Sequence, residues 1–144
     1  MLMKVTDANL LTVYDPRGVV ESANTPIATR PKSVKGSFSK DAEPEIIAEI
    51  AANNDLVLTA IGDCGSCCSC CIRDSVALER LGLPSAAIIT TEFEKETVLT
   101  RTAIGMEGLI PVVIDHPVSS ITQTEVESRA ARVAEMAPKV WLGR

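Results

Sequence analysis

Aromatic side chains are scarce in this sequence: they make up 3% of its 144 residues, although 46% of the residues are hydrophobic. A buried core must therefore consist mainly of Ile, Leu, Val and Ala, which is typical of a parallel sheet covered by helices. Long apolar runs are missing too, since none approaches the ~18 residues of a membrane-spanning helix. We therefore expect one α/β domain over residues 1–144, without membrane contact.

Basic clusters and nucleotide-binding loops are also missing. The net charge is -5, and Lys and Arg are not gathered into a patch, so no nucleic-acid partner is predicted. The sequence has neither a G-x-G-x-x-G nor a Walker-type loop, which argues against a dinucleotide or ATP. The first residues lack the long apolar region of a signal peptide, so we expect a cytoplasmic protein whose thiols stay reduced.

Hydrophobic runs that predict strands alternate with stretches of helical periodicity. The strand candidates are residues 10–14, 56–61, 86–89 and 110–114. Helical patterns run between Asp41 and Asn53, from Cys67 to about Leu81, from Thr91 to about Gly105, and after Thr122. This alternation predicts a three- or four-stranded, mainly parallel sheet with helices on both faces, in three layers as in Rossmann or flavodoxin-like domains.

Two further patterns concern the ends of these elements. Thr91 is followed three residues later by Glu94, and Thr122 by Glu125, which predicts a capping box at the start of each helix. The stretch from about 15 to 40 is rich in Ser, Thr, Pro, Lys and Gly, which predicts an irregular N-terminal arm.

Cysteine is confined to one short segment. All five cysteines lie between Cys64 and Cys71, which excludes a disulfide framework spread across the fold. In a reducing compartment such a cluster is typical of a catalytic or metal-binding site. Cys64–Cys67 and Cys67–Cys70 both have the C-x-x-C spacing, at which a second thiol can attack a bond formed at the first. Cys68 and Cys71 share a helix face with apolar residues, so we expect them to be small buried hydrophobes.

Three loops should meet at one edge of the predicted sheet, because ligands of open α/β sheets bind beyond the carboxyl ends of the strands. These loops are residues 63–67, 90–92 and 115–117, and the third contains His116, the only histidine. Cys64 directly precedes a predicted helix, whose free N–H groups favour a thiolate. His116 is therefore the candidate base or cationic neighbour of this thiolate.

The remaining roles follow from these positions. Cys64 is the candidate attacking sulfur, and Cys67 the resolving one, with Cys70 as the alternative. Gly65 would let the backbone turn tightly and let a substrate approach, and Ser66 could donate a hydrogen bond. The candidate substrate contacts are Gly65, Ser66, Thr91 and Glu92, of which the last two have a capping role as the alternative.

A metal-binding protein is the main alternative. The cysteine cluster could hold Cu(I), Zn or an iron–sulfur cluster, with Cys64, Cys67 and Cys70 as candidate ligands. A structural zinc site usually has two separated ligand pairs, and this sequence has no second pair. No cofactor is therefore predicted, and a metal stays an alternative.

The segment Gly62-Asp63-Cys64-Gly65-Ser66-Cys67-Cys68-Ser69-Cys70 resembles the redox motif of the UGSC-type selenoprotein family. In that family selenocysteine, or cysteine in many members, occupies the position of Cys64. The segment also resembles, more distantly, the selenoprotein of component B of glycine, sarcosine and betaine reductases. That motif is selenocysteine-Gly-Thr-Cys-x-x-Cys. The likeness extends over residues 55–118, and includes the segments 79–84 and 110–117.

This resemblance implies a thiol-dependent oxidoreductase. The Cys64 thiolate would attack a small electrophilic substrate or a disulfide, Cys67 would resolve the adduct, and an external thiol or dithiol would reduce the pair. Because Cys64 stands where the reductases have selenium, a substrate of the glycine type does not follow. A non-catalytic subunit of a larger reductase is a further alternative. We expect a homo-oligomer or a partner subunit in any case, because a small sheet exposes edges that need cover.

Overall fold

The computed structural model describes residues 2–5, 10–15, 18–26 and 40–143. Its strands are β1 (Leu2–Val5), β2 (Leu10–Asp15), β3 (Gly18–Pro26), β4 (Leu56–Gly62), β5 (Ser85–Thr90) and β6 (Val112–Ile114). Its helices are α1 (Pro44–Ala52), α2 (Gly65–Arg80), the 3-10 helix η1 (Thr91–Phe93), α3 (Glu94–Ala103) and α4 (Gln123–Trp141). Within these ranges, no helix is long and apolar enough to cross a membrane.

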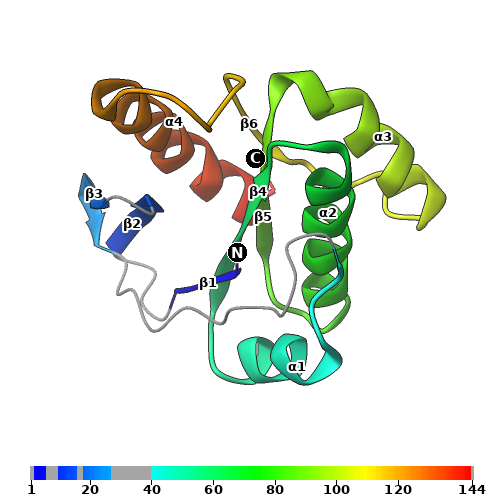
Figure 1. The fold of residues 1–144 in the computed structure, drawn as a ribbon. Coiled ribbons are helices and arrows are strands. Elements are labelled where there is room, and N and C mark those ends of the chain that lie inside the picture. Colours follow the sequence, from blue (N-terminus) through cyan, green and yellow to red (C-terminus); the bar gives the residue numbers. More distant parts are fainter. Residues whose placement is uncertain (1, 6–9, 16–17, 27–39, 144) are drawn as a thin grey trace.

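The main sheet has the strand order β1-β4-β5-β6 (Figure 1). β4, β5 and β6 run parallel, and β1 pairs antiparallel with β4. The predicted α/β fold with a mainly parallel sheet is therefore confirmed. β5 pairs with a parallel strand on each side and is buried along its whole length, which explains its unbroken apolar run.

Alternate side chains of β5 pack against different helices. Ala86 and Ile88 belong to a cluster with Ala130 and Val133 of α4. Ala87 and Ile89 belong to a second cluster with residues of α2. Since successive side chains of a strand point to opposite faces, α4 and α2 pack on opposite sides of β5 (Figure 1).

A third cluster joins α1 to the start of the sheet. Ile47 and Ile50 of α1 pack with Val57 of β4, Leu78 of α2 and Leu83. At the other edge of the sheet, one arginine of α4 bonds to the β6 backbone: Arg132 Nε donates to the Val113 carbonyl at 3.2 Å. The oligomeric state stays a prediction.

The N-terminal region differs from the predicted irregular arm. Residues 18–26 form β3, which pairs antiparallel with β2 in a separate hairpin beside α4. The β-branched pair Val19-Val20 favours a strand. The composition of the arm does not reveal its pairing partner, which is the neighbouring strand β2. β1 is only four residues long and was not among the predicted strands. The rest of the proposed arm, 27–39, lies outside the described residues.

The two predicted capping boxes have different outcomes. The Thr122 hydroxyl accepts the Glu125 N–H, and the Glu125 carboxylate accepts the Thr122 N–H, so this box is confirmed. The prediction at Thr91 is wrong, because Thr91 begins η1 and α3 starts only at Glu94, after Phe93. A backbone N–H from another loop occupies the Thr91 hydroxyl, as described below.

Candidate redox site

The three loops that follow β4, β5 and β6 meet at the carboxyl edge of the sheet, as predicted. Strand register places Thr90 of β5 beside Ile114 of β6, and His116 follows two residues later. The His116 Nδ1 atom lies 2.9 Å from Asp63 Oδ1 and 3.1 Å from Thr90 Oγ1. The backbone N–H of His116 donates to the Thr91 hydroxyl at 3.3 Å. One histidine thus joins all three loops.

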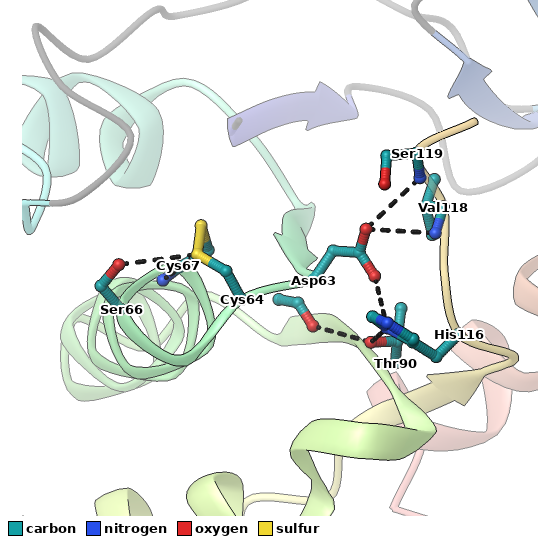
Figure 2. Close-up of a disulfide and its surroundings, with 9 residues drawn as sticks. Asp63, Cys64, Ser66, Cys67, Thr90, His116, Val118 and Ser119 are labelled. Carbon is teal, nitrogen blue, oxygen red and sulfur yellow. Dashed lines mark hydrogen bonds and ion pairs between the residues drawn. A yellow bond between two sulfur atoms is a disulfide. The ribbon is translucent and has the colours of Figure 1, made fainter.

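A disulfide between Cys64 and Cys67 begins α2 (Figure 2). The two sulfurs are 2.01 Å apart, and the Cα atoms are 5.0 Å apart. Cys64 is the N-cap of the helix, because its extended backbone precedes Gly65 and its Sγ accepts the Cys67 N–H at 3.1 Å. The helix therefore begins two residues before the predicted start, and the sulfur of Cys64 takes the place of a capping oxygen.

Gly62 brings α2 close to the sheet at this turn. A Cβ atom at Gly62 would lie 2.9 Å from Ile89 Cγ2 and 3.0 Å from the Cys68 Cα. A Cβ contact below 3.0 Å essentially never occurs in proteins, and 3.0 Å to a backbone atom is unusually tight, so glycine at residue 62 lets α2 pack this close to β5. The close approach fixes the first turn of α2, and with it the disulfide, against the end of β5.

Asp63 lies between the disulfide and the His116 loop (Figure 2). Its Oδ1 atom contacts His116, and its Oδ2 atom accepts the N–H groups of Val118 at 3.1 Å and Ser119 at 3.4 Å. The Asp63 side chain is only 16% exposed, and that of His116 is 31% exposed. Phe93 packs edge-on against the imidazole, with 5.7 Å between ring centroids.

His116 therefore faces a carboxylate rather than the sulfurs. Among the described residues, no hydrogen bond or ion pair joins His116 to Cys64 or Cys67. The imidazole reaches the disulfide turn through Asp63, the residue directly before Cys64. Its predicted role as the base of the Cys64 thiol stays a prediction.

The other predicted contacts lie around this edge. Ser66 is exposed, and its Oγ is 3.5 Å from Cys64 Sγ. Gly65 is exposed, and a Cβ atom there would meet nothing within 4 Å, so open space lies over the first turn of α2. Its φ is not positive, so the turn itself does not require a glycine at this position. Thr91 and Glu92 are exposed on η1, and only the Thr91 hydroxyl has a recorded partner in the site.

The remaining cysteines are buried in α2, and none of them is in a disulfide. Cys68 is 0% exposed, and its Sγ lies 3.1 Å from Thr97 Oγ1. Cys71 is 4% exposed, and its thiol donates to the Thr59 hydroxyl at 3.4 Å. Burial raises the pKa of the Cys68 thiol, and raises that of Cys71 from 9.0 to about 11. The prediction that Cys68 and Cys71 are core residues is confirmed.

Cys70, the alternative resolving thiol, is also buried, with 4% of its surface exposed. It is therefore less accessible than Cys67, which is partly exposed. In the part of the chain that is described, no three His, Cys, Asp or Glu side chains gather as possible ligands of one metal ion. With Cys64 and Cys67 bonded to each other, neither sulfur is a thiolate ligand in this state.

The profile of the UGSC family matches residues 18–143. The chain belongs to the UGSC family. The match begins with β3 and continues through α4, so the family relationship covers far more of the chain than the likeness over 55–118 indicated. No curated protein and no solved structure matches the chain significantly. Membership of the UGSC family and the Cys64–Cys67 pair are compatible with a redox function.

Three residues of the site had no predicted role of their own. Asp63 stood in the reactive segment, and Thr90 in the second loop, but neither was assigned a partner. Phe93 was assigned only to the capping-box segment. The available signal was the position of Asp63: a carboxylate at the end of β4 lies at the edge where the loop after β6 brings the only histidine.

Proposed function

We propose that this UGSC family member is a thiol–disulfide oxidoreductase whose reduced Cys64 attacks its substrate and whose Cys67 resolves the adduct. The Cys64–Cys67 disulfide at the start of α2 carries this proposal. The pair is partly exposed, it lies at the carboxyl edge of a parallel sheet, and the space over Gly65 is open to a small molecule.

The helix start favours Cys64 as the attacking sulfur. In the oxidised state Cys64 Sγ already accepts the Cys67 N–H at 3.1 Å. After reduction the same N–H, with the positive end of the α2 dipole, stabilises a thiolate at this atom. The Ser66 hydroxyl, 3.5 Å from Cys64 Sγ, is a second donor. Cys67 lies in the first turn of the helix, and in this proposal it attacks Cys64 Sγ from within the same turn.

The reaction consumes two thiols and supplies two electrons. With a disulfide substrate, the Cys64 thiolate attacks one sulfur and displaces the other as a thiolate, which leaves a mixed disulfide on Cys64. The Cys67 thiolate then attacks Cys64 Sγ, releases the second substrate thiolate and forms the Cys64–Cys67 disulfide. An external thiol or dithiol reduces this disulfide and completes the cycle.

The same pair can act on a small electrophile with a leaving group. The Cys64 thiolate would displace the leaving group, which departs with its electron pair, and form a carbon–sulfur bond. The Cys67 thiolate would then attack Cys64 Sγ and form the disulfide, while the carbon–sulfur bond breaks and the carbon takes the electron pair and a proton. His116 is an acid–base group at this edge of the sheet, and it would exchange the proton with the substrate rather than with Cys64.

Alkylation tests the order of reactivity. The protein is reduced, treated with a small amount of iodoacetamide near neutral pH, and mapped by peptide mass spectrometry. We expect carbamidomethylation of Cys64 before any other cysteine, because only a stabilised thiolate reacts readily at that pH. Earlier labelling of Cys67, or labelling of Cys68 or Cys71 in the folded protein, would contradict the proposed nucleophile.

Trapping tests the resolving step. Cys67→Ser should accumulate a stable mixed disulfide on Cys64 with 5,5′-dithiobis(2-nitrobenzoate), because the resolving sulfur is gone. The wild type should release both thionitrobenzoate groups and end as the internal disulfide. Cys70→Ser is the matched control and should behave as the wild type. If Cys70→Ser traps the adduct and Cys67→Ser does not, Cys70 is the resolving thiol instead.

A further inference from the structure

Asp63 uses both carboxylate oxygens at the junction of two loops. Oδ1 lies 2.9 Å from His116 Nδ1, whereas Oδ2 accepts two backbone N–H groups from Val118 and Ser119. The residue is directly bonded to Cys64, and its side chain points away from the disulfide toward the His116 loop (Figure 2). One carboxylate therefore ties the segment after β6 to the turn that carries the reactive cysteine.

Hydrogen-bond directions around His116 identify the atom that carries its proton. Thr90 Oγ1 lies 3.3 Å from the Gly62 carbonyl, which can only accept, and 3.1 Å from His116 Nδ1. Both contacts are hydrogen bonds at the same time only when Thr90 donates to Gly62 and offers a lone pair to His116. Asp63 Oδ1 is also an acceptor: it forms an ion-pair contact with Nδ1, and this buried oxygen has no hydrogen-bond partner among the described residues. Two acceptors thus face Nδ1, and they are satisfied only if Nδ1 carries a hydrogen. In the neutral ring, Nε2 then has the free lone pair.

We propose that Asp63 is a positioning residue that holds His116 as the Nδ1–H tautomer, so that Nε2 is the atom that exchanges a proton with the substrate. The tautomer is argued from the contacts of Nδ1 with Thr90 and Asp63. The catalytic consequence rests on the proposed function, in which His116 serves the substrate of Cys64. The Phe93 ring, packed edge-on against the imidazole, limits its rotation and helps to hold this orientation.

Asp63→Asn reverses the tautomer while it keeps the loop in place. The amide oxygen of Asn is the only group that can accept the N–H groups of Val118 and Ser119, so the amide NH2 must face His116. Nδ1 then becomes the acceptor, and the ring proton moves to Nε2. A carboxylate replaced by its amide beside a catalytic histidine has this effect in serine proteases. Thr90→Val is the matched control, because it removes the second acceptor and leaves Asp63.

Nitrogen NMR reports the tautomer directly, because His116 is the only histidine in the chain. The full-length protein is labelled with 15N-histidine, and long-range proton–nitrogen correlations are recorded at a pH at which the ring is neutral. We expect the Nδ1–H pattern in the wild type and in Thr90→Val, and the Nε2–H pattern in Asp63→Asn. A wild type with Nε2–H, or an Asp63→Asn spectrum equal to the wild type, overturns the proposal. The wild-type result decides even if the variant does not fold.

A second readout separates positioning from a structural role and from the proposed function. Turnover of Asp63→Asn should fall by about 10²–10⁴-fold, the usual contribution of an acid–base group. Iodoacetamide alkylation of its Cys64 should stay within about fivefold of the wild type, because a single partly exposed charge is lost. An equal loss of both activities would make Asp63 a structural residue and contradict the proposal. If the wild type itself lacks thiol-dependent turnover, the proposed function fails, and the NMR arm still decides the tautomer.

Discussion

Four of the five cysteines form two pairs with opposite environments, and the fifth, Cys70, is buried like the second pair. Cys64 and Cys67 are partly exposed at the first turn of α2, and their sulfurs are bonded to each other. Cys68 and Cys71 are 0% and 4% exposed, remain thiols, and have raised pKa values because they are buried. The residue type is the same, so the difference comes from position alone: consecutive helix residues are about 100° apart, and Cys67 and Cys68 therefore face different surroundings.

This contrast indicates that reactivity in the cluster depends on the helix start. Cys64 Sγ accepts a backbone N–H at the N-terminal end of α2, where donors without helical partners are available. Cys71, two turns further on, meets the Thr59 hydroxyl and the Ile88 carbonyl inside the core. A carbonyl neighbour repels a thiolate, whereas an N–H stabilises one. The four predictions below test whether the two pairs really differ in this way.

The largest effect is expected on exchanging the nucleophile. Cys64→Ser should lower thiol-dependent turnover with 5,5′-dithiobis(2-nitrobenzoate) and a dithiol reductant by at least about 10³-fold, because a neutral hydroxyl cannot replace the thiolate. Cys71→Ala is the control from the buried pair, and its folded fraction should turn over at the wild-type rate. A Cys71→Ala variant that loses activity without unfolding would show that the buried pair takes part in the chemistry.

Gly62 tests how the division between the pairs is maintained. Gly62→Ala places a methyl group against Ile89 and the Cys68 backbone, at distances of 2.9 and 3.0 Å, so α2 must shift away from β5. Overpacking of this kind lowers the free energy of unfolding by about 1–3 kcal/mol. Gly65→Ala meets nothing within 4 Å and should change it by no more than about 0.5 kcal/mol. Urea unfolding of both variants under reducing conditions checks this, and equal stabilities would contradict the packing argument.

Much of this arrangement was predictable from the sequence because it depends on periodicity. The apolar run over 56–61 gave β4, and the helical spacing of Cys68 with Ile72 placed that cysteine in the core. The meeting of the three loops followed from the parallel sheet, whose strands end at one edge.

The parts that escaped prediction depend on side-chain direction or on distant partners. Thr91 has the sequence of a capping residue, yet its hydroxyl accepts the N–H of His116, which is 25 residues away. Asp63 also has partners that are distant in sequence, because they lie in the loop after β6. A local pattern cannot reveal such partners, because the competing donor comes from another element of the fold. β3 was missed for the same reason, since its partner strand decides its structure.

Titration of the buried pair gives a smaller, pH-dependent effect. Burial holds the proton of Cys71 up to a pKa of about 11, whereas the thiol of the unfolded chain ionises near 9.0. The folded state therefore binds more protons than the unfolded state between these values, and stability is lost as the pH rises through this window. From about pH 8 to about pH 10.5, the free energy of unfolding should fall by roughly 1–2 kcal/mol on account of this group.

Cys71→Ala removes this titration and provides the comparison. The variant is expected to be less stable than the wild type at pH 8 because a buried sulfur is lost, but the gap should narrow as the pH rises. Urea unfolding with a phosphine reductant at both pH values measures the two slopes, and other groups that titrate cancel in the difference. Parallel slopes would mean that Cys71 ionises as readily in the folded protein as in the unfolded chain.

Ser66 should give the smallest effect, and it tests the reactive pair alone. Its hydroxyl lies 3.5 Å from Cys64 Sγ in an exposed position, so its hydrogen bond to the thiolate is weak. Ser66→Ala should therefore slow the alkylation of reduced Cys64 near neutral pH by about two- to fivefold, in line with the loss of one modest hydrogen bond. Ser69→Ala is the matched control one turn later, because the Ser69 hydroxyl bonds to Glu96 and lies 3.3 Å from Thr100 Oγ1. If both variants slow Cys64 equally, the effect comes from the helix as a whole, and the separate environment of its first turn does not account for the reactivity of Cys64.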